Sequence, residues 1–181
     1  LVLGVVQFLL PTTIQAMLTH RTGTPTVSSL FGHAFVHFST ANLVWNALGY
    51  LVYVLLAYAL ALWTDERQWF FLSLFTVVLF VPVLTGLADE VVFDRVLRAG
   101  SVSIRGFSAV VSGVVGLGLV LYLGAVRRRY GPGAVASVAA VLVTWVGVVL
   151  ATVCRPASRP PMAVLLGLSL ALLLGVAGYR T

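Results

Sequence analysis

The chain of 181 residues contains no lysine, a single cysteine and no histidine after position 37. Charged residues make up only 9% of it, against about 25% in an average soluble domain. The absence of lysine excludes a serine–lysine catalytic pair, and the single Cys154 excludes an intrachain disulfide and does not suggest a metal site. The scarcity of charge argues against a soluble domain, so polar residues within long apolar runs become candidates for function.

Hydrophobic residues make up 60% of the chain, and the mean hydropathy is +1.07. A membrane-spanning helix needs about 20 mostly apolar residues. Six segments approach this length, and no stretch shows the polar–apolar alternation of a membrane β-barrel. The sequence therefore predicts an all-α membrane protein with six transmembrane helices. The expected helices cover residues 1–18, 42–63, 69–92, 106–126, 134–154 and 161–179.

The connections between these segments are short, so we expect one transmembrane domain over residues 1–181. The chain begins inside an apolar segment and without Met, and we therefore expect the natural N-terminus to lie upstream. All 11 basic residues are arginines, and against 5 acids they give a formal charge of +6. Because these charges lie between apolar segments, we expect them to meet lipid headgroups rather than nucleic acid. The expected location is multi-pass in the plasma membrane of a prokaryote.

Four polar residues gather around the start of the second segment. His33 and His37 are four residues apart, as are Asn42 and Asn46, and this spacing places each pair on one face of a helix or of its entry turn. An isolated asparagine in a membrane helix is most often an interhelical hydrogen-bonding group. Four such groups near one membrane face favour a functional site instead.

The fourth segment carries Ser108, Ser112 and Gly116 at intervals of four residues. Small residues in such a stripe let helices approach closely. The sixth segment has a similar stripe, formed by Ala163, Gly167, Ala171 and Gly175. We therefore expect the fourth and sixth helices to pack against each other.

The acidic residues offer a second kind of chemistry. A protease that uses two intramembrane carboxylates needs acids on two facing helices, whereas all five acids here lie at helix ends or in loops. Asp89, Glu90 and Asp94, at the end of the third segment, are therefore expected at a solvated loop edge. A transporter is a further alternative for six helices, but the chain shows neither an internal repeat nor buried charge along a pathway.

Two motifs together resemble those of the rhomboid intramembrane serine proteases. The residues from His33 to Asn46 are similar to the family's second-helix pattern H-x-x-x-H-x-x-x-x-H-x-x-x-N, with Asn42 in place of the third histidine. The residues from Gly106 to Gly113 resemble its fourth-helix pattern G-x-S-G-x-x-[SYG]-G. The resemblance implies a six-helix rhomboid-like bundle without metal or cofactor. It implies that Ser108 is the nucleophile and that Asn46, with His37 or Asn42, polarises the scissile carbonyl in a transmembrane substrate.

The histidine base of the family's sixth helix has no counterpart here. Aligning Gly167 with the last glycine of the family pattern H-x-x-G-x-x-x-G places Pro160 at the histidine position. In a serine protease, loss of the histidine lowers turnover by about 10⁶. His33 or His37 could act as a substitute base. The resemblance leaves two functions open: an intramembrane serine peptidase that cuts transmembrane proteins, and an inactive rhomboid-like protein that binds transmembrane helices.

Overall fold

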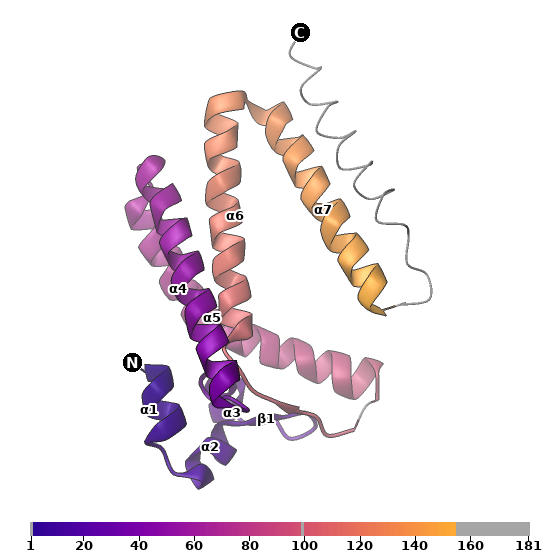
Figure 1. Cartoon of the computed structure of the whole chain (residues 1–181). Coiled ribbons are helices and arrows are strands. Elements are labelled where there is room, and N and C mark those ends of the chain that lie inside the picture. The colour runs from indigo at the N-terminus through magenta and orange to yellow at the C-terminus, as the bar shows by residue number, and fades with distance from the viewer. Residues whose placement is uncertain (1, 99, 155–181) are drawn as a thin grey trace. The chain divides into compact units, whose positions relative to one another are not determined.

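The computed structural model describes residues 2–98 and 100–154 (Figure 1). The chain forms two compact units, Leu1–Leu119 and Val120–Thr181, and the candidate site lies in the first. The described residues are mostly helical. In chain order the elements are α1 (Val2–Phe8), α2 (Thr12–Leu18), β1 (His20–Arg21), α3 (Val27–Gly32), η1 (His33–Phe35), α4 (Thr40–Trp63), α5 (Arg67–Asp89), η2 (Glu90–Val96), β2 (Ser103–Ile104), α6 (Ser108–Tyr130) and α7 (Pro132–Cys154).

The first apolar segment is not the single helix that the sequence predicts. It forms α1 and α2, each 7 residues long, which is far shorter than a membrane crossing. Pro11 lies at the break, and proline has no N–H with which to continue a helical ladder. The side chain of Gln15 donates hydrogen bonds to the carbonyls of Gln7 and Leu10, and so stabilises the turn between the two helices.

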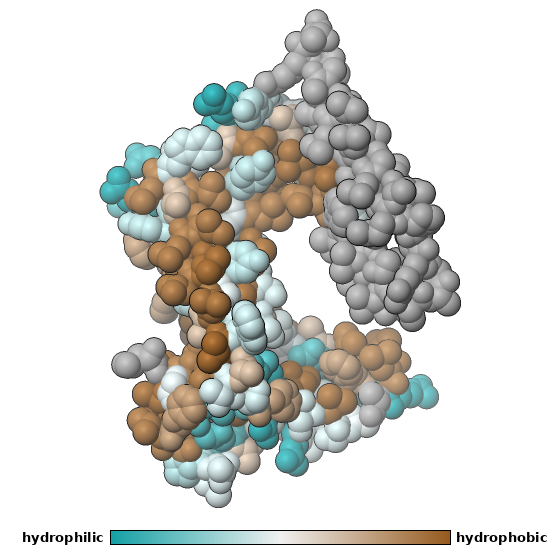
Figure 2. Space-filling model, in the orientation of Figure 1, coloured by the Kyte–Doolittle hydropathy of each residue, from teal (hydrophilic) through white to brown (hydrophobic). Residues whose placement is uncertain are grey.

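Three helices of the described part are long and apolar enough to cross a membrane, compared with the six expected from the sequence. They are Thr40–Trp63, Arg67–Asp94 and Ser108–Tyr130, so the segments expected over 42–63, 69–92 and 106–126 are confirmed to within a few residues. Figure 2 shows hydrophobic residues covering the sides of α4 and α5. Helix α7 covers the expected segment 134–154, and the expected helix 161–179 lies outside the described residues.

Helix α6 approaches both α4 and α5 through small residues. A Cβ added at Gly113 would lie 2.7 Å from Val77 of α5, and one added at Gly118 would lie 3.6 Å from Ala57 of α4. The stripe of Ser108, Ser112 and Gly116 is exposed and therefore does not form these contacts. Its expected partner helix, 161–179, lies outside the described residues, so that contact remains a prediction.

The short elements gather at one end of α4 and α5 (Figure 1). Strand β1 pairs antiparallel with β2, and His20 lies opposite Ile104. Helix α3 begins with a capping box. The backbone N–H of Ser29 donates a hydrogen bond to the Thr26 hydroxyl, and the backbone N–H of Thr26 donates one to the Ser29 hydroxyl. These contacts fix the path of the chain into η1 and then into α4.

Candidate functional site

The start of α4 orients two asparagine side chains. Ser39 is the N-cap residue, and its hydroxyl accepts a hydrogen bond from the backbone N–H of Asn42. One turn later, the Asn46 amide Nδ2 lies 2.9 Å from the Asn42 carbonyl oxygen and 3.4 Å from Asn42 Oδ1. Asn46 is 9% exposed and Asn42 is half-buried. The two side chains therefore form one hydrogen-bonded pair on a single face of the helix.

Gly106 brings the second motif to this pair. Its backbone N–H donates a hydrogen bond of 3.0 Å to the carbonyl of His33. Its φ of +124° lies in a region that L residues rarely adopt, and a Cβ there would stand 3.5 Å from Asn42 Oδ1 and 3.8 Å from Asn46 Nδ2. We call Asn42, Asn46 and Gly106 the polar corner. The structure thus brings together two motifs that are about sixty residues apart.

Ser108 begins α6 and is exposed. It follows Gly106 by two residues, so its Cα lies within about 7 Å of the Gly106 Cα. Between them, Phe107 is 4% exposed and packs in a hydrophobic cluster with Ala34 and Val110. Tyr50 lies one turn beyond Asn46, and its ring packs edge-on against that of Phe107, with 5.2 Å between the ring centroids. This packing fixes the first turn of α6 while the serine side chain stays at the surface.

The two histidines of the first motif are both buried, at 2% exposure each. His33 Nδ1 lies 3.0 Å from the Ser29 carbonyl oxygen, which can only accept, so Nδ1 carries the proton. The backbone N–H of His37 donates to Gln7 Oε1 at 3.2 Å. Its ring nitrogens make no hydrogen bond of good geometry to a described residue, although the Phe35 backbone interacts with the ring and opposes the effect of burial on its pKa. Burial lowers the pKa of both imidazoles, so both are neutral at neutral pH.

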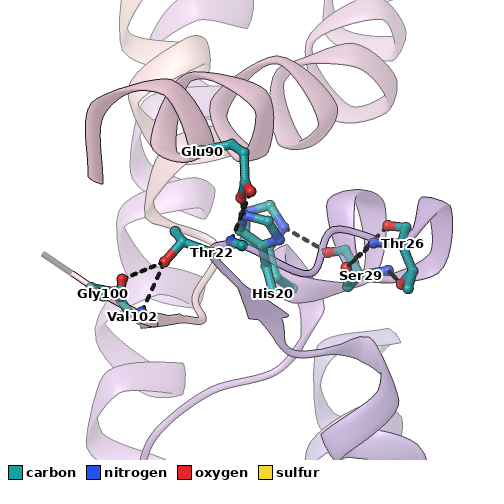
Figure 3. A network of polar contacts seen from close by, with 9 residues as sticks. His20, Thr22, Thr26, Ser29, Glu90, Gly100 and Val102 are labelled. Atoms are coloured by element: carbon teal, nitrogen blue, oxygen red, sulfur yellow. Dashed lines mark hydrogen bonds and ion pairs between the residues drawn. The ribbon is translucent and has the colours of Figure 1, made fainter. Parts of the chain in front are cut away.

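A second polar cluster was not predicted from the sequence. His20 of β1 is fully buried, and its Nε2 lies 3.5 Å from Oε2 of Glu90 at the start of η2 (Figure 3). Glu90 Oε1 accepts a 2.7 Å hydrogen bond from the backbone N–H of Gly23. The solvated loop edge expected for Glu90 is therefore wrong, because this side chain is only 16% exposed and faces His20. The sequence signal for this cluster is weak, because it consists only of His20 just after one helix and Glu90 at the start of another, seventy residues apart.

Among the described residues, no three His, Cys, Asp or Glu side chains are grouped so that they could hold a metal ion. The described part contains three apolar helices that are long enough to cross a membrane, as expected of a helical membrane protein. Comparison of the chain with protein-family models, with curated proteins and with solved structures found no match.

Proposed function

We propose that this protein is a rhomboid-like membrane protein that binds transmembrane segments of other proteins at the polar corner, with Ser108 in the position of a peptidase nucleophile. One observation carries the proposal: Gly106 lies against the amides of Asn42 and Asn46, two residues before an exposed serine. The rhomboid-like arrangement of the long apolar helices, without residues 1–18 as a spanning helix, is part of this proposal.

A transmembrane segment suits this corner chemically. Exposed apolar side chains surround the start of α4, and Trp45 among them is 72% exposed. Beside this apolar surface, the half-buried amide of Asn42 offers hydrogen bonds to the backbone of an unwound segment. An apolar helix with a local break, such as one with glycine in its middle, would satisfy both surfaces.

Binding is favoured over cleavage because Ser108 has no assigned base. The Nδ1–H of His33 already donates a hydrogen bond to the Ser29 carbonyl, and the ring packs against that of His20 with 5.7 Å between the ring centroids. A serine hydroxyl without an adjacent base reacts slowly with a peptide carbonyl.

One observation favours peptidase activity as a second candidate. The His37 ring is neutral and buried, and its nitrogens make no hydrogen bond of good geometry to a described residue, although the Phe35 backbone interacts with the ring. In that case His37 would take the Ser108 proton and the corner amides would stabilise the oxyanion.

The test uses the full chain in phosphatidylethanolamine–phosphatidylglycerol liposomes with a fluorescent transmembrane peptide that contains a central glycine pair. Binding is measured by energy transfer, and cleavage is measured on gels. We expect Asn46→Leu to weaken binding about 3- to 20-fold, because it removes the hydrogen bonds that orient the Asn42 amide towards the bound segment. Equal binding by the wild type and Asn46→Leu would contradict the proposal.

Cleavage is compared between Ser108→Ala and Ser112→Ala, which change the same residue type one turn apart on α6. We expect the same slow background in the wild type and in both variants. Rapid cleavage that is lost only in Ser108→Ala would establish the second candidate.

A further inference from the structure

We propose that His20, His33 and Glu90 form a proton-controlled latch, which holds the loop 19–26 and the polar corner in place at neutral pH and releases them on acidification. This inference goes beyond the proposed function. The release of the loop does not depend on the proposed function. Only the effect of that release on the binding of a transmembrane segment rests on it.

The latch joins elements that are distant in the sequence. Glu90 Oε1 accepts the Gly23 N–H at 2.7 Å, and Glu90 Oε2 lies 3.5 Å from His20 Nε2 (Figure 3). One carboxylate thus contacts both ends of the turn 20–23, through a hydrogen bond at Gly23 and at ion-pair distance from His20, whose ring nitrogens make no hydrogen bond to a described residue. Beside it, Thr22 Oγ1 donates to the Gly100 carbonyl at 3.0 Å and accepts from the Val102 N–H at 2.9 Å.

Two further contacts connect the latch to the polar corner. Opposite His20, β1 pairs with Ile104 of β2, two residues before Gly106. The carbonyl of His33 accepts the Gly106 N–H at 3.0 Å. Any change that displaces His20 or His33 therefore acts on the segment that leads into Ser108.

The charged groups around the latch determine how it responds to protons. His20 and His33 face each other at 5.7 Å between ring centroids, and Asp89 of α5 interacts with both rings. Arg21, the neighbour of His20 on β1, is exposed, and the guanidinium of Arg105 after β2 lies over the Phe38 ring at 5.4 Å. The cluster thus holds two imidazoles and two carboxylates.

The carboxylates of Glu90 and Asp89 favour positive charge on the imidazole pair, whereas burial of the His33 ring opposes it. A second proton must go to Nε2 of His33, since Nδ1 already carries one. Burial is the largest effect and lowers the pKa of His33. A charged His20 lowers it further, whereas Asp89 and the backbones of Ser29 and Leu30 raise it without cancelling the effect of burial. When the pH falls below the ordinary histidine value of 6.5, the open state binds this proton more readily than the closed state. Acid therefore opens the latch.

The experiment follows the mobility of the loop in the full chain in detergent micelles. A nitroxide label is attached to Thr24→Cys in a Cys154→Ser background, because Thr24 is exposed between the two Glu90 contacts and α3. We expect an immobile spectrum at about pH 8 and a several-fold larger mobile fraction at about pH 5. Circular dichroism at both pH values checks that the helices persist, so that release of the loop is distinguished from unfolding.

The decisive variant is His33→Asn, whose amide can replace Nδ1 as donor to Ser29 but cannot be protonated. It should keep the loop immobile at both pH values. The matched control is His37→Phe, which removes another buried histidine outside the cluster and should retain the transition. A transition of the same midpoint in His33→Asn and the wild type would overturn the proposal, as would a loop that is equally mobile at both pH values.

Glu90→Gln supplies an independent second measurement. Its amide oxygen can still accept the Gly23 N–H, but it cannot offset a charge on His20. We expect the opening midpoint to shift to higher pH. A midpoint that is unchanged, in a variant with native helical content, would show that Glu90 is not part of the latch.

Discussion

The backbone N–H of Gly106 donates a 3.0 Å hydrogen bond to the carbonyl of His33. This bond determines where the segment before α6 meets the segment before α4, and it lies between the polar corner on one side and the His20–Glu90 cluster on the other. The two functional hypotheses for this protein therefore depend on the same backbone contact.

Gly106→Ala should destabilise the protein and displace Ser108. The φ of +124° disfavours any side chain, and the added Cβ would also contact the amides of Asn42 and Asn46. A residue held in such a region costs about 1–3 kcal/mol. Thermal unfolding in detergent measures the loss. Gly4→Ala is the control, because nothing lies within 4 Å of the added Cβ in α1; equal melting temperatures for the two variants would contradict this prediction.

Gly113→Ala should destabilise the packing of α6 on α5. The new methyl group would stand 2.7 Å from Val77 Cγ1 and 3.2 Å from Val81 Cγ2, and overpacking of this kind costs about 1–3 kcal/mol. Gly116→Ala, three residues along the same helix, meets no atom within 4 Å and should be neutral or slightly stabilising because alanine favours helix. Chemical denaturation of the two variants side by side measures the difference. A similar change of stability in both variants would mean that the contact of residue 113 with Val77 and Val81 does not decide the outcome.

The long helices follow from the sequence, because an apolar run of about 20 residues has few other ways to satisfy its backbone in lipid. Helices α4, α5 and α6 begin and end within a few residues of the predicted positions. The prediction of one helix over residues 1–18 was wrong. A single proline such as Pro11 hardly lowers the mean hydropathy of the segment, but it removes a backbone N–H donor that a continuous helix needs. Composition alone could not show that break.

The resemblance of the two motifs to one family implies that Asn46 lies near Ser108, and this stays a prediction. The structure places Gly106, two residues before Ser108, beside the amides of Asn42 and Asn46. The latch was not anticipated. His20 and Glu90 each lie at the end of an apolar segment, and only the turn at Gly23 and the π-helical geometry of η2 bring them together. Neither feature has a periodicity that a single sequence displays.

His37→Phe should stabilise the protein, and more so in acid. Both ring nitrogens of His37 are buried without a described hydrogen-bond partner, so an apolar ring of similar size removes a cost of about 1–3 kcal/mol. Because burial lowers the pKa of His37, the unfolded chain binds a proton more readily below the ordinary value of 6.5, and the wild type loses stability as pH falls. Melting temperatures at about pH 8 and pH 5 measure both effects. His33→Phe is the contrast: it removes the bond to Ser29 and should destabilise at neutral pH.

Ser108 should react poorly with a fluorophosphonate probe, because an unactivated hydroxyl is a weak nucleophile towards any electrophile. The expected rate of labelling is close to that of Ser112, the exposed serine one turn away, as judged by comparing Ser108→Ala with Ser112→Ala. Two further variants identify the missing base. Pro160→His restores a histidine at the position that the family pattern assigns, and it should accelerate labelling of Ser108 if the following Pro161 permits the required turn. His37→Phe should leave the slow rate unchanged. Fast labelling of the wild type that disappears in both Ser108→Ala and His37→Phe would show that His37 is the base, and the protein would then be a peptidase rather than a binding protein.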